Sequence, residues 1–253
     1  MWADERIYHP VAFEPYTPAH HFEGGKQEPH LRTKLKIASQ LVELAVGEGI
    51  PFRAVVADSF YGEEEGFKRS LGELEVGYVM ALKPSHAWWH PLGEIGSPYE
   101  AAVAAGQSWQ DERHPGDWVK VMRVSGMGMR RRSGLWRWMM GPYAPRRVRR
   151  AVVATTDPEE LADKATWYLT TKLPHPQCSK RAKEHSKLEA TNLAEIVRLY
   201  GLRMWVEHSY KQVKHVLGWG DYQVRSDIAM RRRWQLVICA FSFRWWTYGR
   251  LPT

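Results

Sequence analysis

A helical pattern between residues 199 and 217 constrains the fold of this chain more than any other stretch. Apolar residues recur there at three- and four-residue intervals, at Leu199, Leu202, Val206, Tyr210, Val213 and Leu217. Such spacing places apolar side chains on one stripe of an α-helix, and that stripe docks the helix onto a protein core. We therefore expect a folded chain in which this helix is buried on one side.

A polar stripe runs beside the apolar one and contains Tyr200, Arg203, Glu207, Lys211 and Lys214. At roughly 100° per residue these five fall within an arc of about 80°. A carboxylate among cations suits divalent-metal and phosphate chemistry, because Glu oxygens bind metal ions while Tyr, Arg and Lys side chains hold phosphate oxygens. The alternative is two ordinary helix ion pairs, Arg203 with Glu207 and Glu207 with Lys211, worth about 0.2–0.5 kcal/mol each.

Composition indicates a globular protein with a polyanionic partner. The 253 residues are 44% hydrophobic, which argues against disorder and allows one large domain or two small ones. A net charge of +8 favours nucleic acid as the partner. The two cysteines are too few for a disulfide framework or a zinc site and fit a reducing cytoplasm. The most apolar run, residues 234–243, is about half of a membrane span, so we expect no membrane contact.

The positive charge is concentrated between Arg130 and Arg150, where there are eight arginines and no acidic residue. Arginine forks grip phosphates and aromatic rings stack on exposed bases, so this segment is a candidate DNA-contacting surface. The residues expected to contact DNA here are Arg130, Arg131, Arg132, Trp136, Trp138, Arg146 and Arg147. A solvated basic loop without a partner is the alternative.

Two short apolar runs predict a strand, helix and strand unit typical of α/β folds, with strands at residues 52–57 and 76–82. Asp58 ends the first strand and opens a Ser-Phe-Tyr-Gly turn. Ligand sites favour the carboxyl ends of strands in α/β folds. The alternative is an N-cap or turn role for Asp58.

The rest of the chain divides into β-like and helical stretches. The first thirty residues are rich in Pro and Gly and are expected to be extended, and a helix is expected from Thr33 to Gly47. We expect strands at 118–124, 148–155 and 166–173. We expect helices at about 188–217, where Gly201 is a candidate kink, and at 227–246, capped by Ser226. The predicted parts are a partial core (1–83), a β-rich basic insertion (84–175) and a helical part (176–253).

Two motifs carry a resemblance to a known family. The order Tyr, two residues, Arg, three residues, Glu, six residues, Lys from Tyr200 to Lys214 resembles the YREK signature of bacterial insertion-sequence transposases with a DDE catalytic triad. Asp58, within Val55-Val-Ala-Asp-Ser-Phe-Tyr-Gly, resembles the second Asp of the same family. The resemblance implies a ribonuclease-H-like α/β core, interrupted by a β-rich insertion and followed by long C-terminal helices.

The resemblance also implies metal-dependent DNA cleavage and strand transfer at transposon ends. Asp58 and Glu207 would be the catalytic metal ligands for Mg²⁺, or Mn²⁺ in its place, with two ions in a complete site. Tyr200, Arg203, Lys211 and Lys214 would contact DNA phosphates. The implied partners are double-stranded DNA, at transposon ends and target, and a second copy or a full-length transposase. The implied location is the bacterial cytoplasm, at the nucleoid.

The first catalytic Asp of the family has no match in this sequence. Residues 3–8 resemble the end of the family's third strand, and Asp4 lies on the wrong strand to replace the missing ligand. We therefore expect an N-terminally truncated transposase, lacking the first strands of its core and inactive alone. One alternative is a non-catalytic DNA-binding fragment that occupies transposon ends or inhibits full-length transposase. Another two-metal nuclease of the same fold is a third reading.

Overall fold

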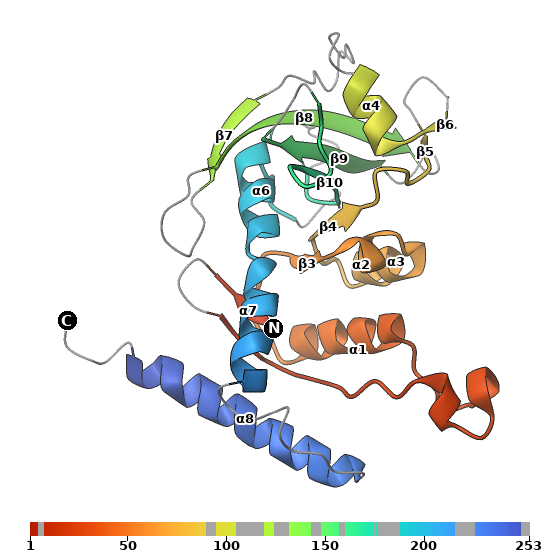
Figure 1. Cartoon of the computed structure of the whole chain (residues 1–253), viewed down its shortest axis with the longest axis vertical. Helices are drawn as coiled ribbons and strands as arrows, with labels where there is room; N and C mark the ends of the chain where they lie inside the picture. The colour runs from red at the N-terminus through yellow and green to blue at the C-terminus, as the bar shows by residue number, and fades with distance from the viewer. Residues whose placement is uncertain are drawn as a thin grey trace. The chain divides into compact units, whose positions relative to one another are not determined.

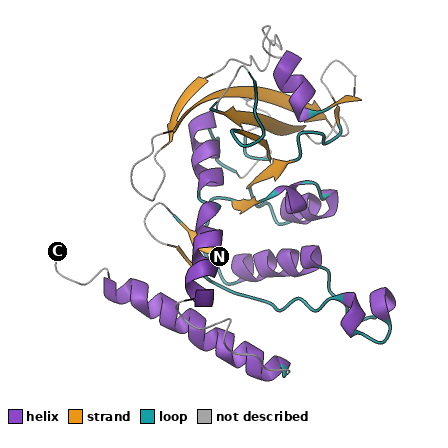
Figure 2. Ribbon diagram, in the orientation of Figure 1, coloured by secondary structure: helices purple, strands orange, loops and turns teal. Residues whose placement is uncertain are grey.

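The chain folds into two compact units. A computed structural model describes residues 1–4, 8–89, 95–104, 119–123, 132–142, 148–156, 160–174, 176, 188–215 and 226–248. One unit combines residues 1–52 with 202–253, and the other contains residues 53–201. Figure 1 traces the chain from its N-terminus to its C-terminus, and Figure 2 distinguishes helices from strands.

A mixed six-stranded sheet forms the centre of the unit of residues 53–201, in the order β3-β4-β10-β9-β8-β7. Its strands are β3 (Val55–Ala57), β4 (Tyr78–Leu82), β7 (Val119–Arg123), β8 (Arg132–Pro142), β9 (Val148–Thr155) and β10 (Thr166–Thr171). β3 and β4 pair in parallel, and all other neighbouring strands pair antiparallel. The long β8 curves across the sheet in Figure 2.

Two helices connect the parallel strands, because parallel neighbours need a crossover. They are α2 (Ser59–Gly62) and α3 (Glu65–Glu73), and Figure 1 shows them beside β4. Phe67 and Leu71 of α3 are buried. A Cβ atom on Gly62 would lie 1.8 Å from the carbonyl oxygen of Ala81 on β4, so only glycine allows α2 to approach the strand this closely.

Apolar side chains cover both faces of this sheet, because successive residues of a strand point to opposite faces. On one face, Val152 and Ala154 pack in the core formed with α6 (Leu193–Gly201), which contributes Ile196. On the other face, Ala151 and Val153 pack with Ala102 of α4 (Pro98–Ala104) and with Leu161 of the loop between β9 and β10. Two short strands, β5 (Trp88–Trp89) and β6 (Ile95–Gly96), form a separate pair.

The other unit is largely helical. Its elements are β1 (Trp2–Ala3), β2 (Tyr8–His9), α1 (Lys34–Gly47), α7 (Met204–His215), α8 (Asp227–Tyr248) and two 3-10 turns, η1 (Ala19–His21) and η2 (Gly25–Gln27). Tyr8 is at the centre of its core: its ring stacks 4.6 Å from that of Trp205 and lies 5.7 Å from that of Phe241. Three aromatic residues thereby join β2, α7 and α8.

A partly buried carboxylate also holds this unit together. Glu14 accepts two hydrogen bonds from Arg231 of α8, at 2.7 and 2.8 Å, and a further one from Arg32. The hydrogen bonds from Arg231 are the main cause that lowers the pKa of Glu14 to about 2. The extended N-terminal segment is therefore attached to α8 by charge as well as by aromatic packing.

The structure confirms the α/β class and most expected elements. The strands expected at 52–57, 76–82, 118–124, 148–155 and 166–173 correspond to β3, β4, β7, β9 and β10. Thr33 caps α1 by accepting a hydrogen bond from the Lys36 amide, and Ser226 accepts one from the Ala229 amide at the start of α8. In the described part of the first thirty residues, 1–4 and 8–30, the regular elements are the short strands β1 and β2 and the 3-10 turns η1 and η2.

The helix expected at about 188–217, with a kink at Gly201, is divided after that glycine. The structure has two helices, α6 and α7, separated by a turn at residues 202–203. After the turn, the amides of Trp205 and Val206 donate to carbonyls three residues earlier, at Leu202 and Arg203. Gly201 ends α6, which is consistent with the poor helix propensity of glycine.

Strand β8 was not expected, and the grouping of residues also differs from the three predicted parts. β4 belongs to the first predicted part and β9 and β10 to the second, yet all three lie in one sheet. The compact units meet in sequence at residues 52–53 and 201–202, whereas the predicted boundaries were at 83–84 and 175–176. The difference arises because β10 pairs with β4, a strand far from it in sequence, as well as with β9.

Candidate active site

Asp58 follows β3 directly and begins α2. Its carboxylate accepts a hydrogen bond of 3.1 Å from the Phe60 amide, so Asp58 is the N-cap of that helix. The residue is nonetheless exposed. One capping bond occupies only part of the acceptor capacity of a carboxylate, which has about four lone-pair sites. Asp58 therefore has both of the properties weighed above: it caps a helix and presents a carboxylate at the end of a strand.

Several contacts hold the Asp58 turn in place. Glu63, at the end of α2, accepts a 2.9 Å hydrogen bond from the Lys83 amide after β4 and lies 3.2 Å from Nδ1 of His86. The buried Nζ of Lys68 donates to the Gly62 carbonyl at 2.7 Å. A site whose residues are fixed by such contacts holds its ligand in a more precise geometry than an unsupported loop does. Glu63 and Lys68 were not expected from the sequence, since their partners come from tertiary contacts.

Glu207 lies on α7, in the unit of residues 1–52 and 202–253. Its side chain is 60% exposed and lies 3.0 Å from the guanidinium of Arg203, one turn earlier. Lys211 and Lys214 are also exposed. The structure therefore has a carboxylate and cations on the accessible side of α7. It also contains the Arg203–Glu207 pair, one of the two ion pairs of the alternative interpretation.

Tyr200 has a different environment from the other four residues of the polar stripe. It lies on α6, in the unit of residues 53–201, and is only 7% exposed. Its ring packs edge-on against Trp167, with the centroids 4.9 Å apart. The turn at residues 202–203 separates it from Arg203 and Glu207. The ring therefore belongs to the core of this unit. Its contact with a DNA phosphate stays a prediction.

Two arginines fix the segment that enters α6. Arg53, before β3, donates to a Glu195 carboxylate oxygen at 3.1 Å and to the hydroxyl of Thr191. Arg150, on β9, donates to the carbonyls of Leu173 at 2.7 Å and Thr191 at 3.0 Å. Arg150 is 5% exposed, so the last arginine of the basic segment serves the core and not the surface.

The remaining residues of the basic segment are described only in part. Arg130, Arg131, Arg146 and Arg147 lie outside the described residues. The backbones of Arg132, Trp136 and Trp138 belong to β8, but their side chains are outside the description. The DNA contacts expected of this segment stay predictions.

The chemistry of the two expected ligands fits a hard divalent cation. Asp58 and Glu207 are exposed carboxylates, and Mg²⁺ prefers oxygen ligands and few protein carboxylates. Within the described ranges, no three His, Cys, Asp or Glu side chains are grouped closely enough to hold a metal ion. Among the described helices, none has the length and apolar character needed to cross a bilayer.

Comparisons with known proteins agree with this chemistry. Residues 2–167 match the family model of the DDE superfamily endonucleases. A protein of Microchaete diplosiphon, named as a probable transposase for insertion sequence element IS701, is 30% identical over 216 residues, or 85% of this chain and 47% of the relative. The chain thus spans about half the length of this relative. Asp58 lies within the family match, and Glu207 lies beyond it.

Proposed function

Because the chain belongs to the DDE superfamily endonuclease family, we propose that it acts in insertion-sequence transposition by metal-dependent DNA cleavage and strand transfer. The mixed sheet and its helices are consistent with the ribonuclease-H-like fold of that family. The observation that carries the proposal is Asp58, an exposed carboxylate at the carboxyl end of β3 inside the family match. We place this activity at DNA in the bacterial cytoplasm.

In this proposal each side chain has a specific role. Asp58 and Glu207 serve as ligands for Mg²⁺ or Mn²⁺, with two ions in a complete site. Ions held there would supply Lewis-acid activation of the attacking water or 3′-hydroxyl and stabilisation of the leaving oxygen. Arg203 orients the Glu207 carboxylate through their ion pair. Lys211 and Lys214, both exposed, attract the DNA backbone, and Tyr200 contacts a phosphate near the cut.

We further propose that these 253 residues hold two of the three carboxylates of the triad. Asp4 is the only aspartate upstream of Asp58. It follows the two-residue strand β1, which pairs with β2 and not with the six-stranded sheet. The third carboxylate then comes from a full-length transposase or from another part of the same protein, and the partner is double-stranded DNA.

The test uses the purified chain, labelled insertion-sequence ends and either Mg²⁺ or Mn²⁺. We expect the chain to retain the DNA and to cleave it poorly, and cleavage to rise when full-length transposase is added. Failure to retain DNA overturns the transposition role. Efficient cleavage by the chain alone overturns only the incomplete triad.

The basic segment supports a second candidate, a non-catalytic DNA-binding fragment that occupies transposon ends. The net charge of +8 and the eight arginines from Arg130 to Arg150 favour it. Reversing the charge of Arg130, Arg131 and Arg132 should then abolish DNA retention, while Glu207→Gln leaves retention and inhibition of full-length transposase unchanged. Loss of retention in Glu207→Gln, with no loss after charge reversal, counts against this candidate.

A further inference from the structure

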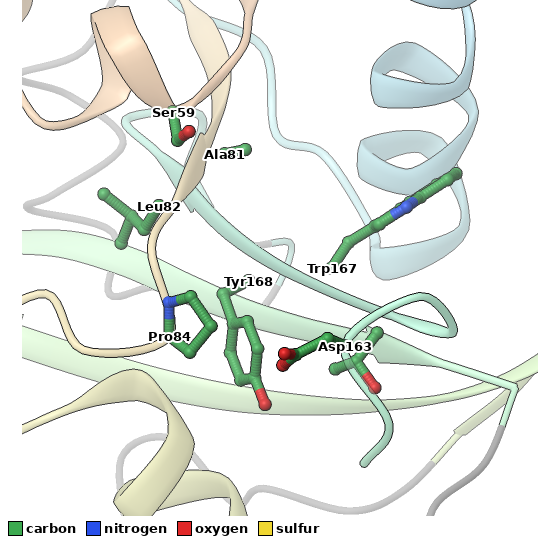
Figure 3. Close-up of a pocket in the computed structure, with 8 residues that line it drawn as sticks. Ser59, Ala81, Leu82, Pro84, Asp163, Trp167 and Tyr168 are labelled. Carbon is green, nitrogen blue, oxygen red and sulfur yellow. The ribbon is translucent and has the colours of Figure 1, made fainter.

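A cavity of about 260 Å³ lies next to the Asp58 turn, within the unit of residues 53–201, and Figure 3 shows Ser59, Pro84 and Tyr168 in its walls. Asp163 is the one charged side chain among the described residues that line it. A carboxylate repels the phosphates of DNA, because like charges raise the energy of a complex. This cavity therefore does not extend a DNA-binding surface.

A smaller cavity, of about 130 Å³, lies between the N-terminal segment, α7 and α8, within the unit of residues 1–52 and 202–253. Its walls include Ala12, Phe13, Val206, Tyr210, Trp234 and Val237. None of the described side chains that line it is charged. We call it the apolar cavity. An uncharged, mainly apolar group fits such walls, whereas a buried phosphate would lack a partner for its charge.

The size of the apolar cavity corresponds to a single aromatic ring. An apolar cavity of about 150 Å³ in another protein binds benzene. Two walls are aromatic, since the rings of Phe13 and Trp234 meet edge-on with their centroids 5.0 Å apart. The apolar cavity, at about 130 Å³, therefore accepts the single ring of a pyrimidine more readily than the two fused rings of a purine.

Tyr210 joins the apolar cavity to the polar stripe of α7. Its side chain lines the cavity and is 59% exposed, so the cavity reaches the surface at this residue. Residues three and four apart are neighbours on a helix surface, so Glu207 and Lys214 lie on either side of Tyr210 along α7. Lys211 and Lys214 are exposed. Cations that attract a DNA backbone thus border an opening lined by an aromatic ring, on which a base can stack.

We propose that the apolar cavity binds one unpaired pyrimidine base of a DNA strand whose phosphates lie along Lys211 and Lys214. The base stacks on Tyr210 and enters the space between Phe13 and Trp234. Stacking depends little on the identity of the base, so thymine and cytosine bind equally and the cavity selects by ring size. This inference rests on the proposed function, because it takes the polar stripe of α7 as a DNA-contacting surface.

The test measures binding of the full chain, without a metal ion, to fluorescent DNA duplexes by anisotropy. Each duplex ends in one unpaired nucleotide, which is thymidine, deoxycytidine, deoxyguanosine or an abasic sugar. We expect the two pyrimidine ends to bind alike, and at least about fivefold more tightly than the purine and abasic ends. A purine or abasic end that binds as tightly as the pyrimidine ends overturns the inference and leaves the DNA role intact. Absence of binding to every duplex overturns both.

Variants locate the site. Tyr210→Ser should weaken binding of the pyrimidine ends at least about fivefold and leave the abasic end within about twofold. Ala12→Phe, which fills the apolar cavity, should have the same effect. Tyr99→Ser is the matched control and should change neither, because Tyr99 is a helix residue, 44% exposed, that does not line the cavity. Tyr210 is mostly exposed, so Tyr210→Ser keeps the fold, and equal weakening of the abasic and pyrimidine ends overturns the site.

Crosslinking places the base directly. Irradiation of a duplex whose unpaired nucleotide is 4-thiothymidine should attach it to peptides that contain Tyr210 or Trp234. Attachment only to other parts of the chain overturns the inference. An apolar side chain of a protein is the competing occupant, and binding of N-acetylphenylalanine amide together with equal binding of all the DNA ends would identify it instead of a base. None of these readouts uses cleavage, so they do not depend on a complete metal site.

Discussion

The carboxylate of Glu207 lies 3.0 Å from the guanidinium of Arg203, and the Glu207 side chain is 60% exposed. Exposed helix pairs at this spacing contribute only about 0.3–0.5 kcal/mol to stability. Arg203→Gln and Glu207→Gln should therefore change the free energy of unfolding by less than about 0.5 kcal/mol. Urea denaturation measures this directly. A loss of several kcal/mol would show that the pair is structural.

Glu14 should make the unfolding free energy depend on acid pH. Its pKa is lowered from 4.5 to about 2 in the folded chain, so its contribution is present above pH 4.5 and is lost as the pH falls towards 2. We expect Glu14→Gln to be less stable than the unmodified chain at pH 7 by about 1–2 kcal/mol. This free energy is smaller than the pKa shift alone implies, because solvent screens the partly exposed Arg231.

The two proteins should approach each other in stability between pH 4.5 and pH 2, and parallel urea titrations at pH 7 and pH 3 measure the change. Glu43→Gln, an exposed change on α1, is the control. A stability difference that stays constant with pH would rule out the ion pair as its cause.

Gly62 should tolerate no side chain. Its replacement by Ala brings a Cβ to 1.8 Å from the Ala81 carbonyl oxygen, which is backbone and cannot move aside cheaply. We expect Gly62→Ala to cost at least about 3 kcal/mol. Gly66→Ala is the matched control, because no atom lies within 4 Å of its added Cβ and α3 should be stabilised by roughly 0.5–1 kcal/mol. Similar melting temperatures for the two variants would contradict the close approach of α2 and β4.

Arg53 should anchor the start of α6. A lysine ammonium cannot reproduce the planar guanidinium that donates to Glu195 and Thr191 together. Arg53→Lys should therefore lower the free energy of unfolding by about 1.5–3 kcal/mol. Hydrogen exchange of the α6 amides should rise more than exchange in β9. Arg69→Lys, at an exposed position of α3, is the control. Uniform exchange changes across the sheet would argue against a local anchor.

Helices and strands whose formation depends mainly on their own residues could be predicted from the sequence. Thr33 and Ser226 cap helices as expected, and the apolar run of β4 and the valine-rich run of β9 form strands. The apolar run before Asp58 likewise predicted that its carboxylate lies at the end of a strand, with an N-cap role as the alternative, and the structure shows both. These features need little information from the rest of the chain.

Features that depend on distant partners could not be predicted. β8 is placed by pairing with β9, where Trp136 lies opposite Ala154. Tyr200 is buried in the core of one compact unit and Trp205, five residues later, in the core of the other, so the helix expected at 188–217 is divided between two cores. The cavity at Tyr168 escaped prediction for the same reason, since β4, β10 and a loop build it together.

Metal binding by Asp58 and Glu207 is the central claim, and titration of Mn²⁺ into the DNA-bound chain, followed by water-proton relaxation, tests it most directly. Asp58→Asn and Glu207→Gln should each weaken Mn²⁺ binding at least tenfold while DNA retention persists, and Glu43→Gln should leave it unchanged. Unaltered Mn²⁺ binding in both carboxylate variants would contradict the claim.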